Sequence, residues 1–204
     1  MTLRNITCAV TLCLLTLSGQ AVGKTEVPPY KNKSLSIEKR VDDLMGRMTL
    51  REKVLQLQNR GAGRLDEIDR IFNGESYGCT HEMGTTAAEC AAMYKELQQY
   101  MLTKTRLGIP IITSVEGIQG ILQNNCTLFP HALAQGSTFN PALIQRMTEA
   151  AGEEAKVIGI HQILSPVLDI ARELRWGRVE ETFGEDPYLI SEMGIAFILS
   201  LIHI

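Results

Sequence analysis

The chain has 204 residues, of which 45% are hydrophobic and 21% are charged, a balance typical of an ordinary globular protein. This length suits one domain of usual size or part of a larger one. The formal net charge is −3 and no run of lysine or arginine occurs, which excludes the basic surface that nucleic-acid binding requires. We therefore expect no nucleic-acid partner.

Residues 1–23 have the pattern of a signal peptide. Arg4 provides a positive start, residues 6–17 are mostly apolar, and Ala21 and Gly23 supply the small side chains of a cleavage site. A bilayer needs about 20 apolar residues to be crossed, so this stretch is too short for a stable membrane anchor. We predict cleavage near Gly23 and an exported protein, either periplasmic or secreted.

Three cysteines remain after this segment: Cys79, Cys90 and Cys126. An odd number allows at most one intramolecular disulfide, and in an oxidising compartment we predict that Cys79 pairs with Cys90. His81 lies between these two cysteines, but no fourth ligand follows at a spacing typical of zinc. No metal site is expected.

Residues 24–36 are polar and contain prolines, so they are predicted to be a linker before a folded domain at 37–204. Apolar side chains recur at helical spacing over 37–48, which predicts a helix with one buried stripe. Thr49 and Glu52 then form a capping box that begins another helix.

Residues 54–57 either continue this helix or begin a strand. The stretch 61–84 contains several glycines and little periodicity, so it is predicted to be a long surface excursion. A second capping box, Thr86 with Glu89, begins a helix with apolar positions repeating through Met101.

Gly108 is placed where the C-terminal cap of that helix belongs, and residues 109–115 are predicted to be a buried strand. Asn140 and Pro141 are a strong helix start, because a capping side chain precedes a proline in the first turn. Gly159 is expected to end this helix.

Residues 162–168 are a second predicted buried strand with Asp169 at its end, and Asp186 with Pro187 begins the last helix. Helices that alternate with short apolar strands indicate a parallel α/β architecture. A doubly wound sheet and a (β/α)8 barrel both fit this pattern. The dinucleotide-binding version is disfavoured, because no G-x-G-x-x-G follows a strand.

The most distinctive segment is WGRVEETFGEDP at 176–187, shortly after the second strand. Arginine offers a planar fork of donors, carboxylates accept hydrogen bonds from vicinal hydroxyls, and an indole can cover the apolar face of a sugar. Such a cluster after a strand is typical of a sugar site. A group of salt bridges that only stabilises the loop is an equally good interpretation of its composition.

Three segments resemble glycoside hydrolase family 3: RVDDLMGRMTLREKVLQL at 40–57, RLGIPIITSVEGIQG at 106–120 and LSPVLDIARELRWGRVEETFGEDPYL at 164–189. They match the family's N-terminal barrel domain in the right order. The resemblance covers residues 35–197, and RWGRVEETFGEDP is its most specific part. It implies an α/β fold that is a partial (β/α)8, TIM-like barrel.

The resemblance implies a retaining β-glycosidase of the β-glucosidase type, whose substrate is a β-linked oligosaccharide or glycoside. In such enzymes a carboxylate attacks the anomeric carbon and water then releases the sugar, which needs two carboxyl groups about 5–5.5 Å apart. No metal or organic cofactor is implied. The alternatives are a β-xylosidase of the same family and a non-catalytic fragment that at most binds sugar.

The resemblance places Glu116 and Arg178 at the substrate. Glu116 comes at the end of a predicted barrel strand, where such sites are built, and its glutamate mildly favours the xylosidase alternative. Its other interpretation is a carboxylate at the start of a helix. Arg178 either binds the same sugar or forms a salt bridge that only shapes its loop.

Four further residues are assigned to the surroundings of this site. Asp169 is expected to orient Arg178 from the end of the strand. Glu181 and Asp186 are expected to be structural, with Asp186 capping the last helix. Trp176 either stacks on a sugar or belongs to the core.

Family members also carry a Lys-His pair and a nucleophilic aspartate in an S-D-W-like segment, and the acid/base carboxylate comes from a second domain. This sequence has no S-D-W, and His203 lacks a preceding lysine. We therefore expect both catalytic carboxylates beyond residue 204 and an incomplete barrel. The apolar run at 198–204 suggests a truncated gene model, and this chain alone is predicted to be inactive.

Overall fold

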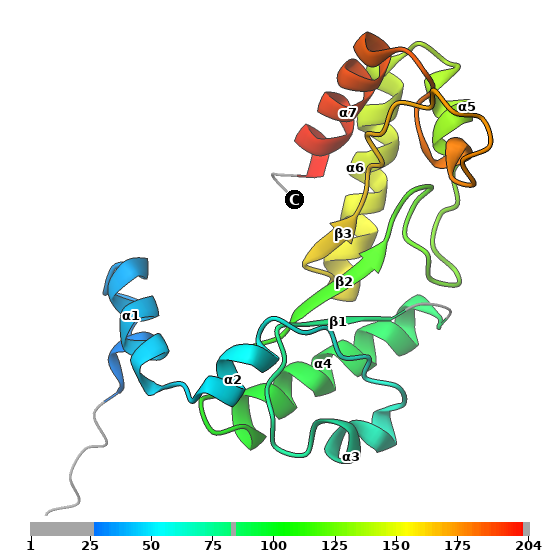
Figure 1. Ribbon diagram of the computed structural model, residues 1–204. Helices are drawn as coiled ribbons and strands as arrows, with labels where there is room; N and C mark the ends of the chain where they lie inside the picture. The colour runs from blue at the N-terminus through cyan, green and yellow to red at the C-terminus, as the bar shows by residue number, and fades with distance from the viewer. Residues whose placement is uncertain (1–26, 83–84, 202–204) are drawn as a thin grey trace, which may run out of the picture. The chain divides into compact units, whose positions relative to one another are not determined.

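Figure 1 shows the computed structural model, which describes residues 27–82 and 85–201. The predicted signal peptide at 1–23 lies outside the described residues, as does the start of the predicted linker. The chain divides after Arg47 into two compact units, which are treated separately below. In the described ranges, no helix is long and apolar enough to cross a membrane.

The first unit contains the 3-10 helix η1 (Pro29–Lys31), which lies inside the predicted linker, and the helix α1 (Ile37–Arg47). Asp43 joins them, because its Oδ2 accepts hydrogen bonds from Tyr30 N at 3.1 Å and from Arg47 Nε at 2.8 Å. The predicted helix is confirmed. Within this unit η1 packs against α1, and no residue of α1 is buried there.

The second unit is built on three parallel strands in the order β1 (Cys79–His81), β2 (Ile112–Glu116) and β3 (Gln162–Leu164). In register, Ser114 of β2 lies opposite His81 on one side and opposite Gln162 on the other. Parallel strands linked by helices confirm the predicted α/β class and agree with part of a (β/α)8 barrel.

Both strands that were predicted from the sequence are shorter than expected. β2 begins later, at Ile112, because Pro110 has no N–H to donate to a ladder. β3 ends earlier, at Leu164, because Pro166 interrupts the pairing in the same way. Asp169 therefore lies in the loop after the strand and not at the strand's end.

Helices lie before, between and after the strands (Figure 1). Those of the second unit are α2 (Leu50–Leu55), η2 (Leu65–Glu67), α3 (Ile68–Phe72), α4 (Ala87–Lys104), α5 (Ala132–Gly136), α6 (Pro141–Ile158), η3 (Val179–Glu181) and α7 (Pro187–Leu201). The ambiguous residues 54–57 continue α2 as far as Leu55, and α7 lies along α6.

Local capping signals determine most helix ends. Both predicted capping boxes form; in the second, Glu89 Oε2 accepts from Thr86 N at 2.9 Å and Thr86 Oγ1 accepts from Glu89 N at 3.2 Å. Asn140 caps α6, and Gly159 ends it in the left-handed region with φ 90°. The cap predicted at Gly108 is wrong, because α4 already ends at Lys104.

The stretch 61–84 is not the surface excursion that its glycines suggested. It contains η2, α3 and β1, and Phe72 is fully buried with its ring 5.6 Å from that of Tyr77. Gly78 is required there for packing, since a Cβ at this position would overlap the carbonyl oxygen of Gln56. Close approach of two backbone segments, rather than a turn, explains this glycine.

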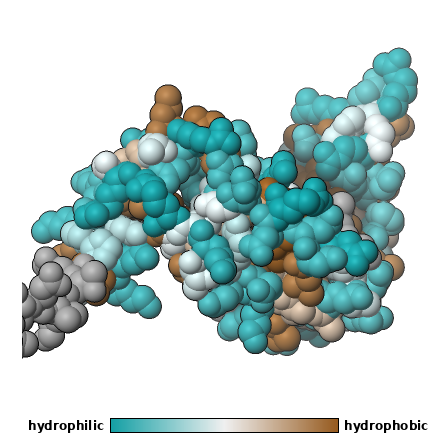
Figure 2. Space-filling model, turned by 90° about the horizontal axis from the view of Figure 1, so that it is seen from below, coloured by the Kyte–Doolittle hydropathy of each residue, from teal (hydrophilic) through white to brown (hydrophobic). Residues whose placement is uncertain are grey.

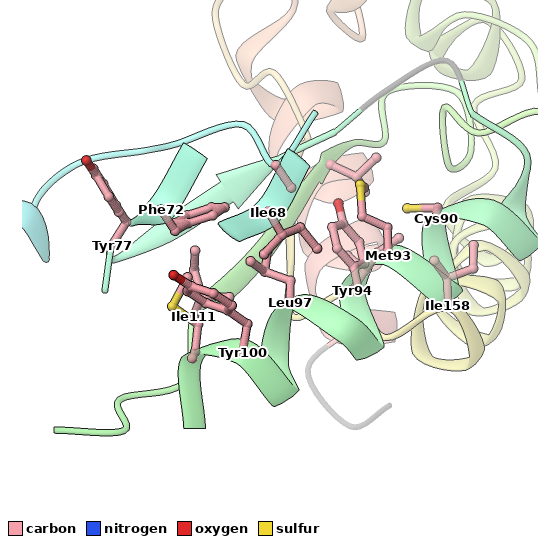
Figure 3. Packing of buried hydrophobic residues seen from close by; sticks show 14 of the residues in the cluster. Ile68, Phe72, Tyr77, Cys90, Met93, Tyr94, Leu97, Tyr100, Ile111 and Ile158 are labelled. Atoms are coloured by element: carbon pink, nitrogen blue, oxygen red, sulfur yellow. The ribbon is translucent and has the colours of Figure 1, made fainter. Parts of the chain in front are cut away.

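Two apolar clusters form the core of the second unit. In the first, Tyr94 and Leu97 of α4 pack with Ile111 and with Ile158 of α6 (Figure 3). The second lies between α6 and α7 and is formed by Ala132, Ile144, Phe183, Ile190, Met193 and Phe197. The three long helices α4, α6 and α7 therefore each contribute buried residues to these clusters, as their apolar spacing predicted.

The predicted disulfide between Cys79 and Cys90 is wrong, because both are free thiols, as is Cys126. Cys90 is buried in the first cluster, on the side of the sheet where α4 packs. Thr80 is fully buried, and side chains alternate along a strand, so Cys79 points to the opposite face of β1. The strand itself separates the two thiols.

Figure 2 shows a face on which hydrophilic side chains predominate, with scattered apolar patches among them. Leucines occur in both environments: Leu97 is fully buried on α4, whereas Leu57, just after α2, is 88% exposed. The two positions form a matched pair for testing the core.

Truncating Leu97 to alanine should lower the free energy of unfolding by about 2–5 kcal/mol, because packing is lost and a cavity remains. The same change at Leu57 should cost less than about 0.5 kcal/mol. Urea unfolding of the two variants measures both values. Equal losses at the two positions would show that α4 does not pack as described.

Candidate functional site

The candidate site begins at the carboxyl edge of the sheet. β2 ends at Glu116, which lies opposite Leu164 of β3 and is half-buried. Gly117 follows directly, and a Cβ there would overlap the side chain of Ile163. Because it lacks a Cβ, Gly117 allows the chain to pass close to β3 as it leaves β2. Glu116 stays at the edge of the sheet where parallel barrels place their sites.

The loop after β3 folds back on itself above this edge. Val167 forms an isolated parallel bridge with Thr182, and Ala171 N donates to Gly184 O at 3.0 Å. The residues between these contacts include Asp169 and the WGR segment. The fold-back returns the chain toward the strand ends before α7 begins.

Arg178 pairs with Glu181 within this loop. Its Nε and Nη2 both donate to Glu181 Oε2, at 2.9 and 2.5 Å. This hydrogen bonding raises the pKa of Arg178 and lowers that of Glu181. The carboxylates of Glu116 and Asp169 also raise the pKa of Arg178, so both act on it electrostatically.

Four of the six predicted residues are therefore linked by hydrogen bonding or by electrostatics: Glu116, Asp169, Arg178 and Glu181. The salt bridge foreseen for Arg178 is present, and its partner is Glu181. The Arg178 side chain is still 56% exposed, and its Nη1 donates to none of the described residues. Pairing with Glu181 and contact with a sugar are compatible, because they use different nitrogens.

The other two predicted residues differ in their roles. Asp186 caps α7 as expected, since its Oδ1 accepts from Leu189 N at 2.8 Å. Trp176 is partly exposed and belongs to neither apolar cluster. Its indole lies two residues before Arg178 in the chain, and sugar stacking and a structural role both stay predictions.

Sequence reasoning missed His131. It precedes α5, which packs on η3, and Gly136 of α5 lies so close to Phe183 that a Cβ would overlap the Phe183 carbonyl oxygen. The proximity of His131 lowers the pKa of Glu181, after the larger effect of Arg178. No local pattern marks this histidine, because its relation to Glu181 arises from the packing of two distant segments.

Comparison with known proteins assigns the chain that carries this site to a family. A profile described as "Glycosyl hydrolase family 3 N terminal domain" matches residues 49–203. The chain belongs to glycoside hydrolase family 3. The resemblance seen in the sequence and the partial-barrel fold are thereby confirmed.

Individual relatives share most of this family 3 chain. A putative β-xylosidase from Formosa agariphila is 35% identical over 184 residues, which are 83% of the chain and 24% of that protein. A periplasmic β-glucosidase/β-xylosidase from Dickeya chrysanthemi is 30% identical over 190 residues, 81% of the chain and 28% of the relative.

A solved structure shares the fold. It is the β-glucosidase from Listeria innocua in complex with glucose, which aligns with TM-score 0.66 and 31% identity over 81% of this chain and 24% of that one. The chain thus spans about a quarter of the length of each of these three proteins.

The Arg178–Glu181 pair predicts a pH effect. The folded pKa of Glu181 lies below its ordinary value of 4.5, so the pair stabilises the fold above that pH and is lost as pH falls through the lowered pKa. Carboxyl NMR should give Glu181 a midpoint below 4.5 that rises in Arg178→Met. Arg146→Met, on the exposed face of α6, is the control and should leave the midpoint unchanged.

Proposed function

We propose that this chain forms part of the sugar-binding site of an exported, retaining β-glycosidase of the β-glucosidase type. The observation that carries the proposal is the placement of Glu116, at the carboxyl end of β2, within electrostatic range of the half-exposed Arg178. Family 3 membership, and the β-glucosidase with bound glucose that shares the fold, support a glycoside as the substrate.

The two residues have complementary roles in this proposal. The Glu116 carboxylate accepts hydrogen bonds from vicinal sugar hydroxyls, and the Arg178 guanidinium donates to a hydroxyl oxygen. Glu181 holds Nε and Nη2 in one orientation and leaves Nη1 for the sugar. Asp169 contributes charge that favours this orientation, which is why we assign it to positioning and not to substrate contact.

Glu116 is proposed to hold the sugar and not to attack it. A retaining mechanism needs a nucleophile and an acid/base group about 5–5.5 Å apart. We assign both to residues of the complete protein outside this chain. A sugar gripped by Glu116 and Arg178 would present its anomeric carbon to those groups, so the two residues act mainly through orientation.

Cleavage of β-xylosides is the second candidate. Glu116 and the similarity to a putative β-xylosidase favour it. The relative from Dickeya chrysanthemi carries both activities in its name, so one family 3 site is compatible with either sugar. The name of that relative also supports export to the periplasm.

The test uses the complete gene product, with aryl β-D-glucoside and aryl β-D-xyloside as substrates. Glu116→Ala and Arg178→Ala should each lower kcat/KM by roughly 10- to 150-fold, the value of one charge-assisted hydrogen bond. Glu96→Ala and Arg146→Ala, on exposed faces of α4 and α6, are matched controls and should change little. Full activity in both site variants would contradict the proposal.

The same assay separates the two sugars. We expect a higher kcat/KM for the glucoside, and proton NMR of the first product should show the β-anomer, as retention requires. A preference for the xyloside would establish the second candidate. Hydrolysis of neither substrate would reject both.

A further inference from the structure

We propose that Cys90 and Cys126 form a redox-sensitive pair that becomes a disulfide when a small-molecule disulfide such as oxidised glutathione is present. This modification would link the start of α4 to the loop that follows β2. The proposal does not depend on glycosidase activity. It rests on the way these two segments are joined.

The backbone brings the two segments together. Ala87 N donates to Asn124 O at 3.0 Å, and Asn124 N donates to Thr85 O at 2.8 Å, so residues 85–87 and 124 pair as in a parallel ladder. Cys90 lies one helical turn after Ala87, and Cys126 lies two residues after Asn124. Both cysteines are therefore close to a rigid junction.

The two residues border the same part of the core. Ala87, Cys126 and Ile158 line one surface cavity of about 310 Å³, which Cys90 itself does not line. Cys126 packs against the first apolar cluster, which contains Cys90 and Ile158. Residues three apart share a helix face, so Cys90 follows Ala87 on the side of α4 that faces Cys126.

Electrostatics agrees with this placement. Burial raises the pKa of both thiols. For Cys90, hydrogen bonds with Tyr94 and Thr85 oppose this rise and Glu82 adds to it. For Cys126, Glu154 raises the pKa further, and a charge on Cys90 does so to a smaller extent. Such thiols react slowly near neutral pH, because only the thiolate attacks a disulfide. Oxidation should therefore accelerate as the pH rises.

The reaction balances in two exchange steps. The thiolate of Cys126, which is partly exposed, attacks glutathione disulfide, forming a mixed disulfide and releasing one glutathione. The Cys90 thiolate then attacks Cys126 Sγ, and the second glutathione leaves. Two protein thiols are oxidised, one glutathione disulfide is reduced, and the two protons end on the two glutathione thiols.

The product would restrain the loop next to the candidate site. This loop returns to β2, since Leu122 N donates to Glu116 O at 3.2 Å. A bond at Cys126 would fix the far end of the same loop to α4. Cys79 takes no part, because it lies on the other face of β1.

The test treats the purified, reduced full chain with oxidised glutathione at pH 7 and pH 9, followed by alkylation and non-reducing peptide mapping. We expect a Cys90–Cys126 linked peptide that forms faster at pH 9, with Cys79 alkylated. The melting temperature should rise by roughly 5–15 °C, as closure of a loop of this length predicts. Cys79→Ser is the matched control and should form the same link.

Cys90→Ser should stop the reaction at the mixed disulfide on Cys126, and Cys126→Ser should yield no internal link. A Cys79–Cys90 peptide, a wild-type chain that retains glutathione on Cys126, or no reaction at pH 9 would each overturn the proposal. Peptide mapping of the wild-type chain shows whether the Cys90–Cys126 disulfide forms, even if a variant fails to fold.

Discussion

The candidate site depends on the backbone pairing of β2 with a neighbour on each side. Its hydrogen bonds to β1 and β3 are supplemented by Tyr94 Oη, which donates to Ser114 O at 3.2 Å, and by Ser114 Oγ, which donates to Thr80 O at 2.8 Å. Glu116 is therefore carried on a backbone that other residues hold in place. A slip of one residue in register would turn this carboxylate to the opposite face of the sheet.

Charge at this edge is arranged around one guanidinium. Arg178 lies among the carboxylates of Glu181, Glu116 and Asp169, of which Glu181 alone is bonded to it. A half-exposed ion pair contributes little to stability, because solvent screens it and both side chains lose conformational freedom. Its main effect is orientation. Donors and acceptors held in fixed directions lose less conformational freedom when a polar ligand binds, so such orientation favours binding.

Most helix caps, which depend on residues within one helical turn of each other, were predicted correctly from the sequence. The two capping boxes, Asn140 at the start of α6 and Gly159 at its end depend on neighbouring residues, and all are present. The cap predicted at Gly108 is the exception, and two other failures arise from contacts between distant segments. Glycines in 61–84 suggested a loop, yet Gly78 serves the contact with Gln56, and Cys79 could not be assigned a face before β1 was located.

In the candidate site, too, local features could be predicted from the sequence, whereas contacts between distant residues could not. Local composition left Arg178 undecided between a salt bridge and a sugar, and only family resemblance favoured Glu116 as its partner. Their approach is produced by the fold-back that joins Val167 to Thr182, and by Gly117 crossing close to Ile163. A glycine has the same appearance in a sequence whether it serves a turn or a close contact. Register and loop closure must be known before two residues so far apart can be assigned to one site.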